Sequence, residues 1–420
     1  MKILTLVSDL EKGGVQRVSQ NFADGYKKLG HDSRLVAVNG GGLRENELKE
    51  LDIKFWLGVN DTVLSQIKRW SPDVVHIHTS GVEIEHVKLL KNISPNSIFI
   101  EKNVFSTPSK WQHLLTYSFQ MSCWCEWKYN SSFRSKKNIV EIVPNPVKVE
   151  KFYPSDKQKV FDLKKNLNIP NNNIILGRVG QAFPGKWSPI LIKSFELICR
   201  KYNNIFLILV NPPIEIIKQS KNSVFKEKIK IINEVFGDNY LRDIYSMIDI
   251  FALAADQGES FGNVLAESLL CETPAVVLST PWGDNSQCEV VGNMVGGIVA
   301  LSKNGFKNGL LKLIIDKNLR IELGIKGRKR IISKYEQILV CKLILDKLKK
   351  KFYRKKLKSG SFEILEIYND SIERANILTK FLINFSILMP LTRITSGYQN
   401  IIEFLLRYLK ILKNKFRIKK

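Results

Sequence analysis

The sequence predicts an α/β protein with two doubly wound, Rossmann-like domains. Residues 1–38 have the pattern of an apolar strand, a loop with paired glycines, a helix and a second strand. A strand, a glycine-rich loop and a helix recur from residue 174 onward. The chain has 420 residues, and single hydrophobic cores stop growing beyond roughly 250–300 residues, so a division into two domains is expected.

The loop of the first unit contains Gly13 and Gly14, and Arg17 follows in its helix. A dinucleotide site would need G-x-G-x-x-G, which this loop lacks, so the alternative to a ligand loop is an ordinary strand-to-helix turn. The next buried strand, at residues 71–80, places two histidines on one face. We expect no metal there, because no third and fourth ligand stands nearby.

The most informative segment is residues 259–277, where a glycine turn opens a helix between two glutamates eight positions apart. Gly262 allows the backbone to turn sharply and to approach a ligand closely. The unpaired N–H groups of Asn263 and Val264, together with the helix dipole, favour a bound diphosphate.

The two glutamates of this segment suit the hydroxyl groups of a sugar. Glu259 precedes the helix, and Glu267 lies inside it and leans back toward its start. Carboxylates are pure acceptors, so one can bind sugar hydroxyls and the other ribose hydroxyls. The alternative is a helix cap at Ser260 with two ordinary glutamates.

This segment resembles the signature of the family-4 glycosyltransferases, retaining enzymes of the GT-B architecture that include bacterial polysaccharide and lipopolysaccharide enzymes. The resemblance covers roughly residues 1–350. It implies two facing Rossmann-like domains and catalytic roles for Glu259, Lys186 and Arg178. It also implies a donor-binding set made of Gly13, Gly14, Arg17, Gln181, Phe261, Gly262, Asn263, Val264 and Glu267.

The sequence departs from the family pattern in two places. The family has an arginine and, five residues later, a lysine on the donor diphosphate; Lys186 matches the lysine, but Gln181 stands at the arginine position and Arg178 is the nearby substitute. The family histidine at the end of a first-domain strand is also missing. Glu101, Asn103 or His113 could replace it, and the sequence does not decide among them.

The resemblance divides the chain into four parts. Residues 1–165 are expected to form the acceptor-side domain and 166–335 the donor domain. Residues 336–353 are expected to form a helix that crosses back to the first domain, and 354–420 a basic amphipathic helical extension.

The implied reaction moves a sugar from a nucleoside diphosphate sugar to a glycan or lipid-linked acceptor, with retention, as in hexosyltransferases. No D-x-D occurs in the chain, so we expect no metal and no cofactor beside the co-substrate. Two other readings stay open: a catalytically inert nucleotide-sugar-binding scaffold on the same fold and, less favoured, a nucleotide-sugar epimerase.

Composition bears on the setting of the protein. Six cysteines without regular spacing and a start without a signal peptide predict the reducing cytoplasm. The net charge is +25, and the last 80 residues hold 19 Lys and Arg against 6 Asp and Glu, a net +13.

The tail has two sequence features of its own. Its apolar run at 381–391 is too short to span a bilayer, which takes about 20 residues. The helix expected after Gly397 is basic and amphipathic, which suits the inner face of an anionic membrane. Alternatively, this helix packs its apolar side on the enzyme, or its basic residues only reflect a lysine-rich composition and have no role. Nucleic-acid binding is disfavoured, because the basic and aromatic residues form no recognisable binding module.

Overall fold

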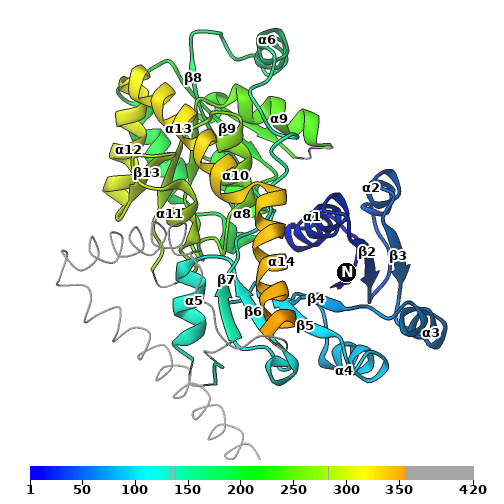
Figure 1. Cartoon of the computed structure of the whole chain (residues 1–420). Coiled ribbons are helices and arrows are strands. Elements are labelled where there is room, and N and C mark those ends of the chain that lie inside the picture. The colour runs from blue at the N-terminus through cyan, green and yellow to red at the C-terminus, as the bar shows by residue number, and fades with distance from the viewer. Residues whose placement is uncertain (133, 137–138, 234, 236, 282, 355–420) are drawn as a thin grey trace, which may run out of the picture. The chain divides into compact units, whose positions relative to one another are not determined.

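The computed structural model describes residues 1–354 except 133, 137, 138, 234, 236 and 282 (Figure 1). The basic extension expected over 354–420 therefore lies, from residue 355 onward, outside the described residues. Within the described part, no helix combines the length and the apolar content needed to cross a bilayer.

The first sheet has seven parallel strands in the order β3-β2-β1-β4-β5-β6-β7. Its strands are β1 (Lys2–Val7), β2 (Asp32–Ala37), β3 (Lys54–Leu57), β4 (Val74–His78), β5 (Ile98–Lys102), β6 (Tyr117–Gln120) and β7 (Val140–Ile142). The strand order reverses between β1 and β4, which is the switch point where doubly wound sheets bind ligands beyond the carboxyl ends of the strands.

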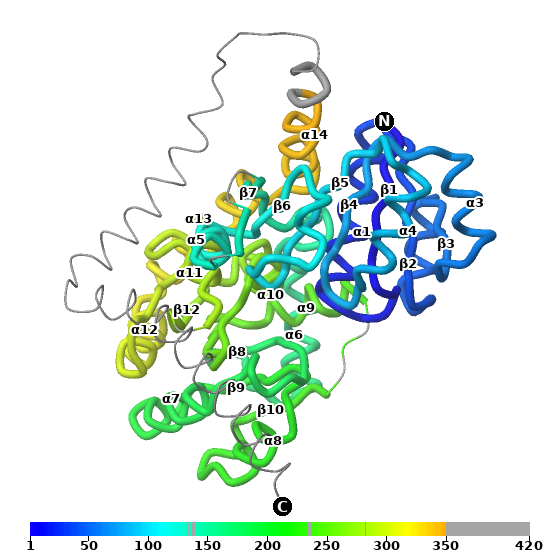
Figure 2. The backbone as a smooth tube through the Cα atoms, turned by 90° about the horizontal axis from the view of Figure 1, so that it is seen from below, coloured from blue at the N-terminus to red at the C-terminus, as the bar shows by residue number. Residues whose placement is uncertain are grey.

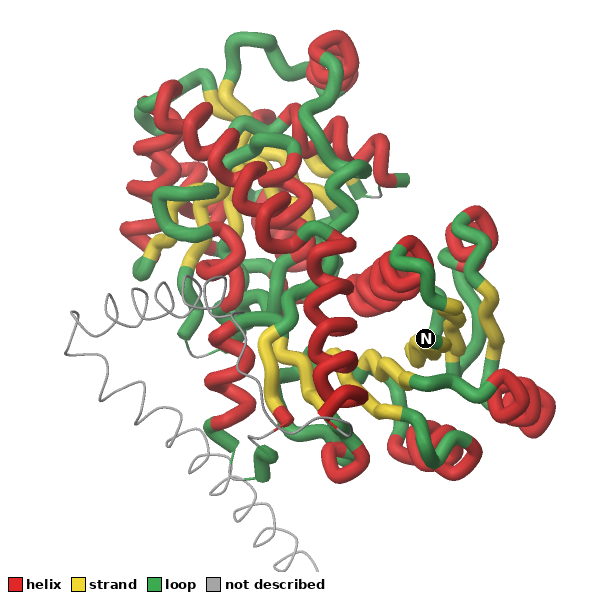
Figure 3. Tube along the Cα trace, viewed as in Figure 1, coloured by secondary structure: helices red, strands yellow, loops and turns green. Residues whose placement is uncertain are grey.

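Helices cover both faces of the first sheet (Figure 3). They are α1 (Gly14–Lys28), α2 (Glu45–Glu50), α3 (Asp61–Trp70), α4 (Ile84–Ile93), η1 (Gln112–Leu114) and α5 (Cys123–Asn130). On one face Val63 and Ile67 of α3 and Leu90 of α4 pack on Leu4 and Val75. Successive side chains of a strand point to opposite faces, and the central strands β1 and β4 are buried on both faces.

The second sheet has six parallel strands in the order β10-β9-β8-β11-β12-β13. Its strands are β8 (Ile174–Val179), β9 (Ile205–Val210), β10 (Ile229–Ile232), β11 (Ile250–Leu253), β12 (Ala275–Leu278) and β13 (Gly297–Ala300). Its helices are α6 (Lys157–Asn166), η3 (Pro184–Lys186), α7 (Ile190–Cys199), α8 (Ile214–Lys221), η4 (Lys226–Lys228), α9 (Asp238–Met247), α10 (Asn263–Leu270), α11 (Ser286–Val291), α12 (Lys303–Ile315) and α13 (Lys317–Tyr335). Two parallel, doubly wound sheets confirm the predicted fold class.

Helix α14 (Gln337–Arg354) follows the second sheet in sequence but belongs to a core of the first (Figure 2). Its Ile344 and Leu348 pack with Phe22 and Tyr26 of α1. A Cβ at Gly25 on α1 would lie 2.4 Å from Cys341 Sγ, so glycine is what allows the two helices to meet so closely.

Candidate functional site

The start of α10 is built around Gly262, whose φ of +86° lies in the left-handed region that favours glycine. The N–H groups of Leu265 and Ala266 donate back to the Gly262 carbonyl. The N–H groups of Asn263 and Val264 have no acceptor among the described residues. The turn therefore presents two free backbone donors at the positive end of a helix, as anion sites require.

Glu259 lies beside this turn between two cations. Lys186, at the end of η3, donates from Nζ to Glu259 Oε2 at 2.8 Å and to the Gly258 carbonyl at 3.2 Å. Arg178 Nη2 donates to Glu259 Oε1 at 3.3 Å. Such charge-assisted bonds are about twice as strong as neutral ones, so they hold the carboxylate in one place.

Arg178 is fully buried on β8, and its guanidinium is enclosed by the protein. Nη1 donates to the Val179 carbonyl at 2.6 Å and Nη2 to the Lys186 carbonyl at 2.8 Å, while Trp187 and Phe251 lie 5.3 and 5.8 Å from its Cζ. Burial lowers its pKa, although Glu259 opposes the shift. Arg178 therefore ties the Lys186 loop to Glu259, and its direct contact with a diphosphate stays a prediction.

Gln181 lies on the same loop, and its side chain is exposed. Its backbone carbonyl accepts from Trp187 Nε1 at 2.8 Å, which anchors the loop. The position at which the family has an arginine thus carries no charge here, and Lys186 is the cation that this loop contributes.

Glu267 is buried one turn into α10 and already has two donors. Arg17 of α1 forms an ion pair with Glu267 Oε1 at 2.5 Å, and the Tyr245 hydroxyl donates to Oε2 at 2.9 Å. Arg17 also pairs with Asp238 at the start of α9. Burial raises the pKa of Glu267, and the Arg17 charge and the Tyr245 hydroxyl only partly oppose that shift.

The glycine loop after β1 faces the same helix start. A Cβ on Gly14 would lie 3.5 Å from Asn263 Nδ2, and Asn145 Nδ2 donates to Asn263 Oδ1 at 3.3 Å. Gly13 caps α1 with extended backbone and accepts the Arg17 N–H. Gly13 and Gly14 thus stand opposite the free N–H groups of α10.

A small cavity of about 30 Å³ lies at this junction. Its lining consists of Arg17, Asn21, Pro146, Val147, Lys148, Lys151, Phe152, Asp238, Asn263 and Glu267. A cavity of this size has room for a few water molecules at most, so it cannot hold a nucleotide while Arg17 and its neighbours keep these positions.

Phe261 and the loop residues after β12 support the turn. Phe261 is buried and packs edge-to-face on Tyr335 at 5.3 Å. Asp284 accepts from Ser260 Oγ at 2.6 Å and pairs with Lys128 of α5 at 2.8 Å. No sequence motif marks the pairing of Asp284 with Lys128.

The three substitutes considered for the family histidine have other partners. Glu101 is buried and accepts from Trp111 Nε1 and Ser118 Oγ, and burial raises its pKa. Asn103 accepts the N–H groups of its own loop, and His113 is exposed on η1. Among the described residues, none of the three contacts Glu259, Lys186 or Glu267, so the choice between them stays open.

His76 and His78 of β4 lie in the core. Their rings are 4.7 Å apart, and the Phe22 ring lies 4.8 Å from His76 and 5.7 Å from His78. Burial, with the Lys102 charge, lowers the pKa of His78 to about 3, so the pair is neutral at pH 7. The described residues contain no group of three or more His, Cys, Asp or Glu that could hold a metal ion.

Two parallel Rossmann-like sheets, with the charged residues gathered where a glycine loop meets a helix start, define the GT-B class of glycosyltransferase fold. Residues 160–330 match the family described as Glycosyl transferases group 1. The chain therefore carries a glycosyltransferase group 1 domain, which confirms the resemblance to glycosyltransferases.

Similar curated proteins include glycosyltransferases of bacterial capsular polysaccharide and lipopolysaccharide synthesis, and a phosphatidylinositol N-acetylglucosaminyltransferase subunit of Saccharomyces cerevisiae. The capsular polysaccharide biosynthesis glycosyltransferase CapM of Staphylococcus aureus is 26% identical over 51% of this chain and 56% of its own length. The lipopolysaccharide 1,2-N-acetylglucosaminetransferase of Salmonella typhimurium is 23% identical over 47% of this chain and 52% of its own. The chain thus matches little more than half the length of these relatives.

Solved structures agree with the fold. Anabaena HepE in complex with UDP has a TM-score of 0.69 at 15% identity, over 83% of this chain and all of HepE. WaaG, a glycosyltransferase of lipopolysaccharide biosynthesis, has a TM-score of 0.59 at 13% identity, over 82% of this chain and 98% of WaaG.

Proposed function

We propose that the protein is a retaining glycosyltransferase that moves a sugar from a nucleoside diphosphate sugar to a glycan or lipid-linked acceptor in cell-surface polysaccharide synthesis. The observation that carries this proposal is the start of α10, where two free N–H groups stand between Glu259 with Lys186 and Glu267 with Arg17. The names of CapM and the Salmonella enzyme support the class of product.

Each part of the donor has a matching group. The diphosphate lies against the Asn263 and Val264 N–H groups and the Lys186 ammonium, all of which favour negative charge. Glu267 accepts the ribose hydroxyls after Arg17 leaves it, and Glu259 accepts hydroxyls of the sugar. HepE was crystallised with UDP and with UDP-glucose, which supports UDP-sugars as the first donors to test.

The chemistry in this proposal is charge stabilisation and positioning. As the bond between the sugar and the diphosphate breaks, negative charge grows on the leaving diphosphate, and fixed donors lower the barrier most where charge develops. Lys186 and the helix N–H groups supply that stabilisation. Arg178 holds the Lys186 backbone and the Glu259 carboxylate in position relative to each other. In this proposal these cations take the part that a metal ion plays elsewhere.

The proposal is tested by hydrolysis of UDP-sugars without acceptor, followed by proton NMR of the released sugar. We expect slow release of the sugar with the donor's anomeric configuration as the first product, and loss of this release in Glu259→Gln. Release of the opposite anomer first would contradict retention.

Gln181 favours one competing function, an inert nucleotide-sugar-binding scaffold. An exposed, uncharged side chain stands where the family has a phosphate-binding arginine. Such a scaffold would bind UDP-sugars in calorimetry but release no sugar at any enzyme concentration.

A further inference from the structure

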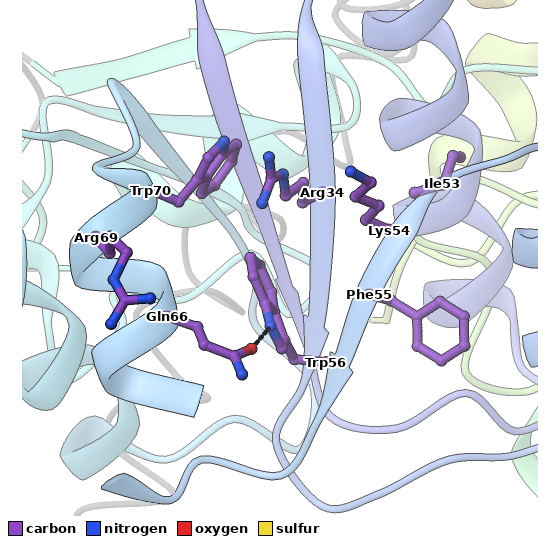
Figure 4. A pocket seen from close by; sticks show the side chains of 8 residues that line it. All are labelled: Arg34, Ile53, Lys54, Phe55, Trp56, Gln66, Arg69 and Trp70. Atoms are coloured by element: carbon purple, nitrogen blue, oxygen red, sulfur yellow. Dashed lines mark hydrogen bonds between the residues drawn. The ribbon is translucent and has the colours of Figure 1, made fainter. Parts of the chain in front are cut away.

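A groove of about 700 Å³ lies on the first sheet, at the edge that β3 forms (Figure 4). Its lining consists of Arg34, Ile53, Lys54, Phe55, Trp56, Gln66, Arg69 and Trp70. The volume falls within the roughly 300–1,000 Å³ typical of small-molecule sites. None of the predicted donor-site residues contributes to its lining.

Strand register explains how the groove forms. Lys2 pairs with Asp32, and Arg34 pairs with Lys54, across parallel strands, so these side chains stand on one face of the sheet. Trp56, two positions after Lys54, shares that face. Helix α3 covers the face only in part, and its Gln66, Arg69 and Trp70 form the other wall of the groove.

The groove lies at the opposite end of the sheet from the donor site. Asp32 and Lys54 are the first residues of β2 and β3, whereas the Gly13–Gly14 loop follows the carboxyl end of β1. Six residues of strand at about 3.3 Å each separate the two ends by roughly 15–20 Å. A ligand in the groove would thus leave the donor site open.

Arg34 is held in place by aromatic and acidic partners. Its Nε and Nη2 donate to the two oxygens of Asp32, each at 3.1 Å. Its Cζ lies 4.4 Å from the Trp70 ring and 5.7 Å from the Trp56 ring, which are cation–π distances. Arg34 Nη1 has no acceptor among the described residues, so the fixed guanidinium keeps donor capacity for a ligand.

The charges around the groove are unbalanced. Burial tends to raise the pKa of Asp32, but Arg34, the Trp70 N–H and Lys54 hold it below its usual range, so Asp32 is charged. Arg34, Lys54 and Arg69 carry three positive charges against the one negative charge of Asp32, so the groove has a net charge of +2. Lys54 and Arg69 are exposed and form no ion pair with any described residue.

We propose that this groove binds an anionic saccharide, with a carboxylate or phosphate on Arg34, Lys54 and Arg69 and an apolar ring face beside Trp56. The choice of a saccharide rests on the proposed function, in which the product is a cell-surface glycan. A second binding site for the growing glycan would raise the effective concentration of the glycan at the distant transfer site. A concave groove of this kind suits a discrete ligand better than a lipid surface, which is contacted by protruding apolar residues.

The test uses the full chain, without nucleotide, and tetragalacturonate as the probe in calorimetry. We expect saturable binding that weakens with salt, at least tenfold weaker binding in Lys54→Ala/Arg69→Ala, and no binding of the neutral maltotetraose. The matched control is Lys193→Ala/Lys201→Ala, which removes the same charge from exposed sites on α7 and in the turn after it and should bind as the wild type does.

Three results would overturn the proposal: no binding of tetragalacturonate, an equal loss in the control variant, or unchanged binding in both Lys54→Ala/Arg69→Ala and Trp56→Ala. Flotation with phosphatidylglycerol vesicles that depends on Lys54 and Arg69, without saccharide binding, would assign the groove to lipid headgroups instead. Repeating the titration with Glu259→Gln separates the two claims, since failure of transfer leaves groove binding intact.

Discussion

At the residue scale, both glutamates of the α10 segment are already paired with cations. Lys186 holds Glu259, and Arg17 holds Glu267 from the other sheet's first helix. A carboxylate that its ion pair already orients needs less reorganisation when hydroxyl groups arrive. In the proposed donor complex, Arg17 must leave Glu267 before ribose hydroxyl groups can take its place.

Replacement of Lys186 tests the proposed contact between its ammonium group and the donor diphosphate. Lys186→Ala should weaken UDP-sugar binding by about 1.5–3 kcal/mol, the usual value of a hydrogen bond to a charged group. Calorimetry measures the change, and the exposed Lys193→Ala on α7 is the control for charge alone. Unchanged binding in Lys186→Ala would remove this lysine from the site.

The residues around the motif show where sequence reasoning stops. Gly262, Asn263 and Glu267 form one local turn and helix, so their spacing alone predicts the arrangement. Arg178 reaches Glu259 from β8 and Tyr245 reaches Glu267 from α9, 81 and 22 positions away in sequence. Asp238 of α9 pairs with Arg17, 221 positions away. No motif marks such contacts, because folding alone brings them together.

At the scale of elements, the contact between α1 and α14 depends on a missing side chain. Gly25→Ala would place a Cβ 2.4 Å from Cys341 Sγ, and overpacking of this kind typically costs about 1–3 kcal/mol. Urea unfolding should show that loss. In Gly25→Ala/Cys341→Ala the sulfur is gone, so most of the loss should be recovered; no recovery would mean that the two helices do not meet here.

Strand β4 gives the protein a predictable sensitivity to acid. The folded pKa of His78 is about 3 against an ordinary value of 6.5, so below pH 6.5 the unfolded chain binds more protons and stability falls as the pH falls. One such histidine costs about 1.4 kcal/mol per pH unit, and His76 shifts in the same direction. Urea unfolding at pH 7.5 and 5.5 should show a drop that is smaller in His78→Gln, and equal drops would contradict the shift.

The openings of both sheets could be predicted from the sequence, but the groove on the first sheet could not. Apolar strands followed by glycine loops predicted both openings, β1 with α1 and β8 with α7, because strand and helix periods are local signals. The groove beside β3 was not predicted, because Arg34, Trp56 and Trp70 come from three elements and only the register brings them together.

At the scale of the whole molecule, the charge of the last 80 residues calls for a partner. Residues 355–420 hold 13 Lys and Arg against 5 Asp and Glu, a net +8. Each basic residue near an anionic membrane contributes about 1 kcal/mol, so this segment can hold the enzyme at the surface. Full-length protein should float with anionic liposomes at low salt, and a chain ending at Arg354 should not. Equal behaviour of the two chains would leave the tail without a membrane role.

We propose that the α10 segment binds a nucleotide sugar, and calorimetry of UDP-sugars with two glutamate variants decides this. We expect Glu267→Ala to lose most nucleotide affinity, and Glu259→Gln to keep nucleotide affinity and lose turnover, with both variants folded by circular dichroism. Wild-type affinity for UDP-sugars in a folded Glu267→Ala would contradict it.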